Sequence, residues 1–76
     1  MDLDISGHAL TVVEERELDK QWVLRTVEAA ELVEAHDDGT KHYLLRIPER
    51  DDRVLRVVVN PMTVPPKVVT VFFDRR

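Results

Sequence analysis

The residues best suited to chemistry in this chain are histidines and arginines in its C-terminal half. His42 and Arg46 lie four positions apart in one alternating segment, and Arg56 and Thr70 take the same phase in the next two. Strand side chains two or four positions apart share a face, so the four should meet on one surface. Arginine offers a permanently charged fork to phosphate oxygens, and histidine exchanges protons near neutral pH. The group fits phosphodiester cleavage, but the aliphatic side chains that share its face favour an ordinary polar sheet surface.

A second candidate group stands near the N-terminus, where His8 and Arg16 flank a predicted helix. The positive end of the helix dipole disfavours a protonated imidazole, so His8 would suit a neutral base. The alternative is a structural role, with His8 bonded to a neighbouring strand and Arg16 paired with an acid such as Asp19. The sequence favours the structural role.

The segments that carry the first group divide into two faces at a period of two, which fixes their expected orientation. One face is apolar throughout and should meet the core: Tyr43, Leu45, Ile47, Leu55, Val57, Val59, Val69, Val71 and Phe73. The other face mixes aliphatic and polar side chains and should be accessible to solvent: His42, Leu44, Arg46, Val54, Arg56, Val58, Val68, Thr70 and Phe72.

Helical spacing and capping residues predict two helices before the strands. Ser6 is a plausible N-cap for a helix from His8 to about Glu17, and Asp19 for one from Lys20 to Ala30. Leu3–Ile5 precedes them as an edge strand or as extended chain. The predicted strands follow at Leu32–His36, Lys41–Ile47, Arg53–Asn60 and Lys67–Asp74, with Asp38-Gly39 as a type I′ hairpin turn between the first two.

The expected fold is therefore a single α+β domain over residues 1–76. Two helices should pack on one face of a four-stranded antiparallel sheet, in the order α-α-β-β-β-β. Leu32–His36 or Lys67–Asp74 should lie at a margin of the sheet.

Composition narrows the classes of function. The chain has 76 residues, a net charge of −4 and no cysteine, so disulfides and thiolate zinc sites are excluded. Residues 1–38 hold eleven acids and three bases, whereas residues 39–76 hold four acids and eight bases. No stretch is long and apolar enough to cross a bilayer, and a cytoplasmic location is expected. The spacing of histidines and acids does not match a metal site. With only two glycines the chain cannot form a glycine-rich phosphate loop, so no cofactor is expected.

Several short motifs resemble a family of small bacterial domains of unknown function. They are His8-Ala9-Leu10, Glu15-Arg16, Leu18, Trp22-Val23, Asp37-Asp38-Gly39, Arg56-Val57-Val58-Val59 and Val69-Thr70-Val71. That family is similar in its order of elements to the RelE/ParE and BrnT toxins of toxin–antitoxin pairs. The resemblance implies helices on one side of an antiparallel sheet and, in the ribonuclease members, basic active residues on the open sheet face.

Two functions follow as alternatives. The first is a protein-interaction module that binds an antitoxin-like partner on its sheet face or at a strand edge. The second is a ribonuclease acting on RNA through His42, Arg46 and Arg56, with His8. Net acidity and the lack of a clear proton-transfer partner for His42 favour the first, since Tyr43 falls on the core face.

Overall fold

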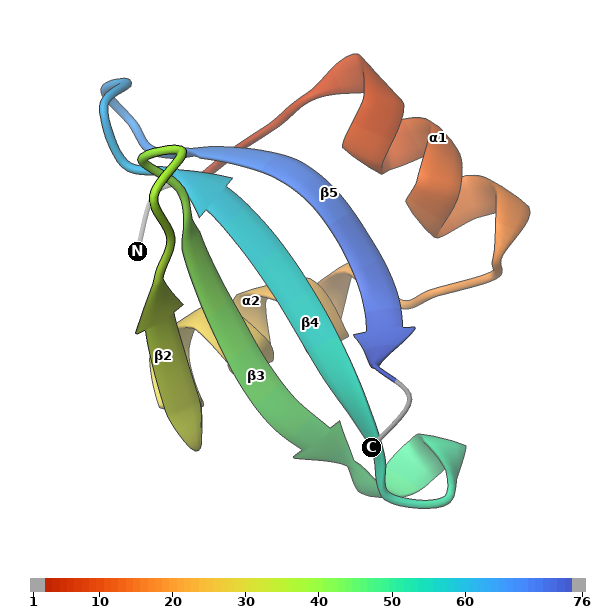
Figure 1. Cartoon of the computed structure of the whole chain (residues 1–76). Helices are drawn as coiled ribbons and strands as arrows, with labels where there is room; N and C mark the ends of the chain where they lie inside the picture. Colours follow the sequence, from red (N-terminus) through yellow and green to blue (C-terminus); the bar gives the residue numbers. More distant parts are fainter. Residues whose placement is uncertain (1–2, 75–76) are drawn as a thin grey trace.

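The computed structural model describes residues 3–74 and shows two helices on one side of a twisted sheet (Figure 1). The predicted helices and strands are all present, within two residues of their expected ends. Along the chain the elements are β1 (Asp4–Ile5), α1 (Gly7–Glu15), α2 (Lys20–Ala29), β2 (Leu32–Ala35), β3 (Lys41–Ile47), the short 3₁₀ helix η1 (Pro48–Arg50), β4 (Arg53–Asn60) and β5 (Lys67–Asp74).

The sheet has five strands in the order β1-β5-β4-β3-β2, so the prediction of four antiparallel strands needs correction. The lead-in forms β1, which pairs with β5 in parallel, while all other pairs are antiparallel. Backbone hydrogen bonds from Asp4 N to Pro66 O (2.9 Å) and from Ser6 N to Val68 O (3.0 Å) join it to β5. β2 lies at the sheet margin, as predicted, whereas β5 is flanked by β1.

Both predicted helix caps are present. The Ser6 hydroxyl accepts a hydrogen bond from the backbone N–H of Ala9 (3.1 Å), and the Asp19 carboxylate accepts one from that of Gln21 (2.8 Å). These bonds satisfy donors that the first helical turn leaves unpaired. With nine and ten residues, neither helix is long and apolar enough to cross a membrane.

The apolar side of the sheet meets the helices and forms the core. α2 crosses behind β3 and β4, and α1 lies against β5 (Figure 1). Eight of the nine predicted core positions lie in or against the core cluster. The exception is Val69, which is 37% exposed, while Val68, predicted on the open face, is fully buried. A bulge causes the exchange: Val59 pairs with Val68 but Val58 pairs with Thr70, so β5 carries one extra residue there.

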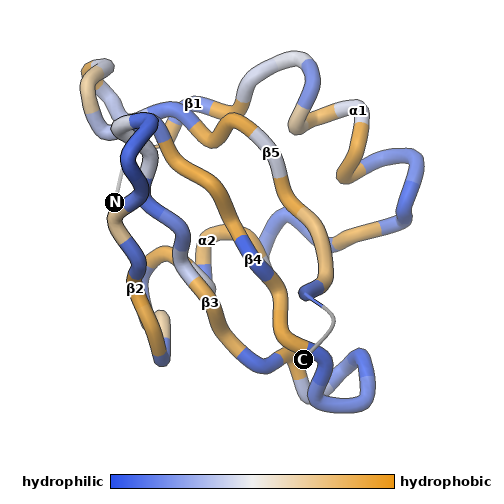
Figure 2. The backbone as a smooth tube through the Cα atoms, viewed as in Figure 1, coloured by the Kyte–Doolittle hydropathy of each residue, from blue (hydrophilic) through white to orange (hydrophobic). Residues whose placement is uncertain are grey.

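The turn between β2 and β3 differs in type from the prediction. A type I′ turn needs positive φ at both central residues, whereas here Gly39 is at φ 87° and Asp38 is not in the positive-φ region. The Asp38 carboxylate instead accepts hydrogen bonds from the backbone N–H (2.9 Å) and hydroxyl (2.6 Å) of Thr40. Figure 2 shows this turn as one of the most hydrophilic parts of the chain.

Candidate functional site

Arg56 is the centre of a polar cluster on the side of the sheet that faces away from the helices. Its Nε and Nη2 donate to Asp74 Oδ2 (2.9 and 2.6 Å), and its Nη1 donates to Glu34 Oε1 (3.0 Å) and His42 Nδ1 (2.8 Å). These four bonds use nearly all the donors of a guanidinium group. Figure 2 shows the corresponding hydrophilic interruption in an otherwise hydrophobic β4.

Strand register brings these four residues together from four strands. Glu34 on β2 lies directly opposite His42 on β3, and Arg56 on β4 lies opposite Phe72 on β5, two residues before Asp74. The Arg56 side chain is 11% exposed and that of Asp74 is 19% exposed. The expectation that Arg56 stands free in solvent is therefore wrong, because two carboxylates and a histidine enclose it.

The hydrogen bond from Arg56 fixes the tautomer of His42. A guanidinium only donates, so His42 Nδ1 must accept, and the proton of the neutral imidazole then sits on Nε2. The pKa of His42 is lowered, first by burial and then by the positive charges of His36 and Arg56. Burial by itself would lower the pKa of Arg56, but hydrogen bonds to Asp74 and Glu34 outweigh it, and the net pKa is raised.

The other predicted site residues lie outside this cluster. Arg46 points from the same side, but its Nε and Nη2 donate to the two oxygens of Glu31 (3.3 and 3.0 Å). Thr70 shares the face on β5, opposite Val58. His8 and Arg16 are exposed at the two ends of α1, which packs on the opposite side of the sheet. The structure thus unites His42 with Arg56 and separates them from His8 and Arg16.

This geometry does not favour phosphate chemistry at His42. A phosphate would have to displace Glu34 or Asp74 from Arg56, and both carboxylates would repel it. The proton on His42 Nε2 leaves that nitrogen unable to accept another. The cluster is best described as a polar clasp that ties β2, β3, β4 and β5 together.

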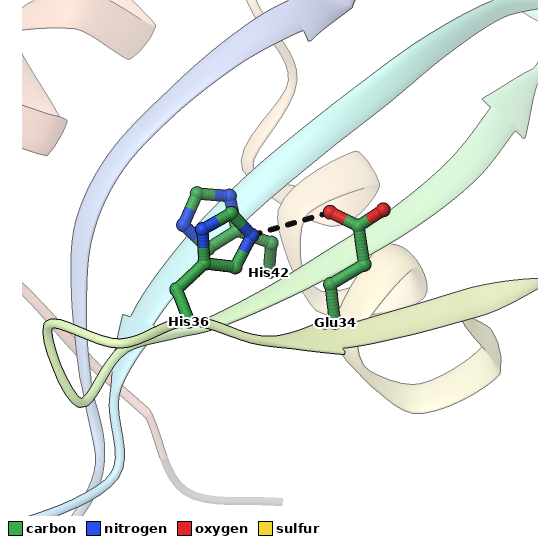
Figure 3. A group of neighbouring side chains, drawn as sticks. All are labelled: Glu34, His36 and His42. Carbon is green, nitrogen blue, oxygen red and sulfur yellow. Dashed lines mark hydrogen bonds and ion pairs between the residues drawn. The ribbon is translucent and has the colours of Figure 1, made fainter.

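Three side chains of metal-binding type also meet here. Figure 3 shows Glu34 on β2, and His36 directly after that strand, beside His42, and one ligand atom from each lies within 4.8 Å of the others. His36 Nε2 is 3.2 Å from Glu34 Oε1, and its ring stacks on that of His42 with centroids 3.6 Å apart. Helical spacings in the sequence do not predict this group, because strand register brings its members together.

Arg56 works against a cation at these three residues. It donates to Glu34 Oε1 and His42 Nδ1, so a permanent positive charge already holds one ligand atom of each residue. A divalent ion would have to displace that guanidinium and bear its repulsion. A zinc-binding histidine usually donates its second ring N–H to a carboxylate or a carbonyl. His42 does the reverse, because its Nδ1 accepts a hydrogen bond from Arg56. The arrangement therefore does not match a preformed metal centre.

A small apolar groove lies next to the clasp, where β2 begins and β3 ends. Its volume is about 150 Å³, and it is lined by Glu31, Leu32, Leu44, Leu45, Arg46 and Val54. The Glu31–Arg46 ion pair forms its polar rim. Leu32 and Val33, at the start of the margin strand, are 44% and 49% exposed.

The sequence patterns did not place Glu34 and Asp74 beside Arg56 on the open side of the sheet. Glu34 alternates in phase with His36, and the three-residue loop 37–39 sets Glu34 opposite His42. The two-residue turn predicted at Asp38-Gly39 would have set Glu34 opposite Tyr43, so the predicted hairpin register did not give this contact. Asp74 continues the phase of Thr70 and Phe72. Glu34 and Asp74 therefore share the face of His42 and Arg56, and their carboxylates neutralise the arginine.

Comparison with known proteins gives one match. The family model described as "Domain of unknown function (DUF4258)" covers residues 5–73. No curated protein and no solved structure matches the chain, so the likeness to RelE/ParE and BrnT toxins stays a prediction. Because the matched region takes in nearly all of the sequence, the chain belongs to the DUF4258 family, whose function is unknown.

Proposed function

We propose that this domain is a noncatalytic protein-interaction module that receives an extended segment of a partner protein along β2. The partner strand would pair with the free edge of β2 and set an aliphatic side chain into the groove beside Leu32 and Leu44. This mode, strand addition at a sheet edge, takes affinity from backbone hydrogen bonds and specificity from side-chain pockets.

The observation that carries this proposal is the exposed aliphatic surface on the β2 edge. Among the described residues, β2 pairs with β3 alone. Native proteins guard such edges with charged side chains, proline, a bulge or a short strand. β2 is short, but it has no lysine or proline, and its one charged side chain, Glu34, is held by Arg56 and His36. Leu32 and Val33 expose aliphatic surface on its two sides.

The paired state of Arg46 and Arg56 supports a binding role over an RNA-cleaving one. Each guanidinium already holds carboxylates, so neither offers the free fork that a phosphodiester needs. The groove beside them is apolar and of the size of one aliphatic side chain. An antitoxin-like protein with a hydrophobic, strand-forming segment is the partner chemistry that these features fit.

The test joins partner binding to RNA integrity. The domain is co-expressed in a bacterial host with the product of the adjacent gene, and the complex is measured by light scattering after size exclusion. We expect a stoichiometric heterocomplex that Val33→Asp abolishes, with normal growth and intact RNA when the domain is expressed alone.

The matched control is Val64→Asp, which adds the same charge at a residue that is 99% exposed in the loop after β4. It should leave the complex unchanged. RNA cleavage that is lost in His42→Asn would instead establish the ribonuclease alternative. A homodimer broken by Val33→Asp would replace the partner protein with a second copy of the chain.

A further inference from the structure

Three arginine side chains converge on one cavity on the opposite part of the molecule from β2. The cavity has a volume of about 250 Å³ and is lined by Arg16, Leu18, Arg50, Arg53 and Phe73. Its walls come from the end of α1, η1, the start of β4 and the end of β5. We propose that this cavity binds a phosphate monoester, the terminal phosphate of a small phosphorylated ligand, between the three guanidinium groups.

The charges of these arginines lack the compensation found elsewhere in the domain. The other three described arginines each form an ion pair: Arg25 with Glu49, Arg46 with Glu31, and Arg56 with Glu34 and Asp74. Within residues 3–74, no carboxylate lies within ion-pair distance of the guanidinium groups of Arg16, Arg50 and Arg53. Three like charges around one cavity repel one another, and a bound anion would relieve that repulsion.

Two of the guanidinium groups are held in place by contacts other than acids. Arg50 Nη2 donates to the backbone carbonyls of Arg16 (3.3 Å) and Glu17 (3.5 Å). The Arg50 guanidinium carbon also lies 5.6 Å from the ring centre of Trp22, and that of Arg53 lies 4.7 Å from the ring centre of Phe73. Cation–π contacts of this kind orient a guanidinium without neutralising it. Less conformational entropy is then lost when an anion binds.

The same contacts indicate which part of the ligand is recognised. Arg53 and Arg50 already lie over the Phe73 ring, at 4.7 and 5.7 Å, so a base would have to compete with these guanidinium groups to stack on it. Recognition therefore rests mainly on the anionic group. A cavity of about 250 Å³ is below the roughly 300–1,000 Å³ of typical ligand pockets, so it suits a phosphate with a small organic group.

Charge and geometry favour a monoester over a diester. A monoester carries nearly two negative charges at neutral pH and three terminal oxygens, whereas a diester carries one charge and two such oxygens. Three guanidinium forks match the first set of acceptors more fully. The site is independent of β2, so it can be tested whether or not the proposed partner binding is correct.

The experiment titrates the full chain with three probes at low ionic strength, followed by calorimetry and amide chemical shifts. The probes are inorganic phosphate, glycerol phosphate as monoester and dimethyl phosphate as diester. We expect saturable binding of the first two, with shifts at Arg16, Leu18 and Arg53, and affinity for the diester at least tenfold weaker. Arg16→Gln and Arg53→Gln should each weaken glycerol phosphate binding about tenfold, because each removes charge-assisted hydrogen bonds.

The control is Arg25→Gln, which removes the same charge from an arginine on α2 that is already paired with Glu49. It should leave the affinity within about twofold, since only long-range charge is lost. If all three variants weaken glycerol phosphate binding equally, the binding depends only on net charge, and the proposed site is wrong. Absence of saturable monoester binding would also overturn it. Equal affinity for the diester, or tight binding of a 5′-hydroxyl RNA oligonucleotide lost in Arg53→Gln, would replace the proposal with a nucleic-acid surface.

Discussion

Arg56 Nη1 lies 2.8 Å from His42 Nδ1, and this single contact sets the protonation state of the histidine. The guanidinium can only donate, so Nδ1 keeps its lone pair toward Arg56 and a second proton cannot enter without breaking the bond. His42 and Arg56 belong to neighbouring strands, β3 and β4, and lie two residues from direct opposition, since Arg56 pairs with Leu44 and His42 with Val58. The contact therefore couples the charge of a histidine to the packing of the open side of the sheet.

The first prediction concerns the stability of this clasp. Arg56→Ala should lower the free energy of unfolding by about 1–3 kcal/mol, because it removes the four hydrogen bonds that this largely buried guanidinium donates to Asp74, Glu34 and His42. Arg56→Lys should recover part of the loss, since it keeps the charge but not the fork. Urea unfolding measures both. Arg46→Ala is the control: its side chain is 63% exposed, and the loss should stay below about 0.5 kcal/mol. Equal losses at the two positions would contradict the clasp.

The second prediction concerns pH. The folded pKa of His42 lies below its ordinary value of 6.5, so below about pH 6.5 the unfolded chain binds this proton more readily than the folded chain. The associated stability is present above that pH and is lost as the pH falls through the folded pKa. The acids Asp38 and Glu34 act in the opposite direction on His42, but burial and the charges of His36 and Arg56 outweigh them. Unfolding by urea at about pH 7.5 and about pH 5.5 should show this decrease.

His42→Asn isolates that part of the pH dependence. Asparagine keeps an acceptor for Arg56 but does not titrate, so the decrease between the two pH values should shrink. His8→Asn, at the exposed start of α1, should retain the decrease of the parent chain. An unchanged decrease in His42→Asn would assign the pH dependence to other groups.

The helices and strands could be predicted because their signals are local. Ser6 and Asp19 cap the helices as their side-chain chemistry dictates, and the alternating segments bury the expected face of β3 and β4. The fifth strand was harder to foresee, since two residues carry no periodicity. Asp4 and Ile5 become a strand only through hydrogen bonds to β5, more than sixty positions away.

Two members of the candidate site, His42 and Arg56, could be predicted, but its acids and its charge balance could not. Alternation correctly placed His42 and Arg56 on one side, but which acids meet them depends on register across three strand pairs. Glu34 and Asp74 come from β2 and β5, on either side of β3 and β4. The arginine cavity could not be predicted from the sequence for a related reason. Arg16 and Arg50 meet only through tertiary packing between two turns.

The third prediction tests the bulge in β5. Val68→Ala should cost about 1–3 kcal/mol, because Val68 is fully buried in the core, whereas Val69→Ala should cost about 0.5 kcal/mol or less at a partly exposed position. The two substitutions remove the same atoms from adjacent residues, so the comparison controls for chemistry. Thermal or urea unfolding measures the difference. A larger loss at Val69 would restore the uninterrupted alternation that the sequence alone predicts.

The fourth prediction concerns the turn that ends α1 beside the arginine cavity. Glu17 has φ 53°, and Leu18 N donates to Val13 O (2.8 Å) while Glu17 N donates to Glu14 O (3.2 Å). This is the Schellman pattern, in which glycine is the favoured residue at the left-handed position. Glu17→Gly should therefore raise the free energy of unfolding by about 0.5–1 kcal/mol, because the Cβ that crowds the backbone is removed. Glu17→Ala keeps that Cβ and should change stability by less than about 0.5 kcal/mol.

The control for Glu17→Gly is the same exchange one turn earlier. Glu14→Gly places glycine inside α1, where its extra freedom in the unfolded chain should cost about 0.5–1 kcal/mol. The two glycine variants should thus shift the urea midpoint in opposite directions. Loss of stability in both would mean that the Glu17 side chain contributes more to the folded state than its left-handed backbone costs.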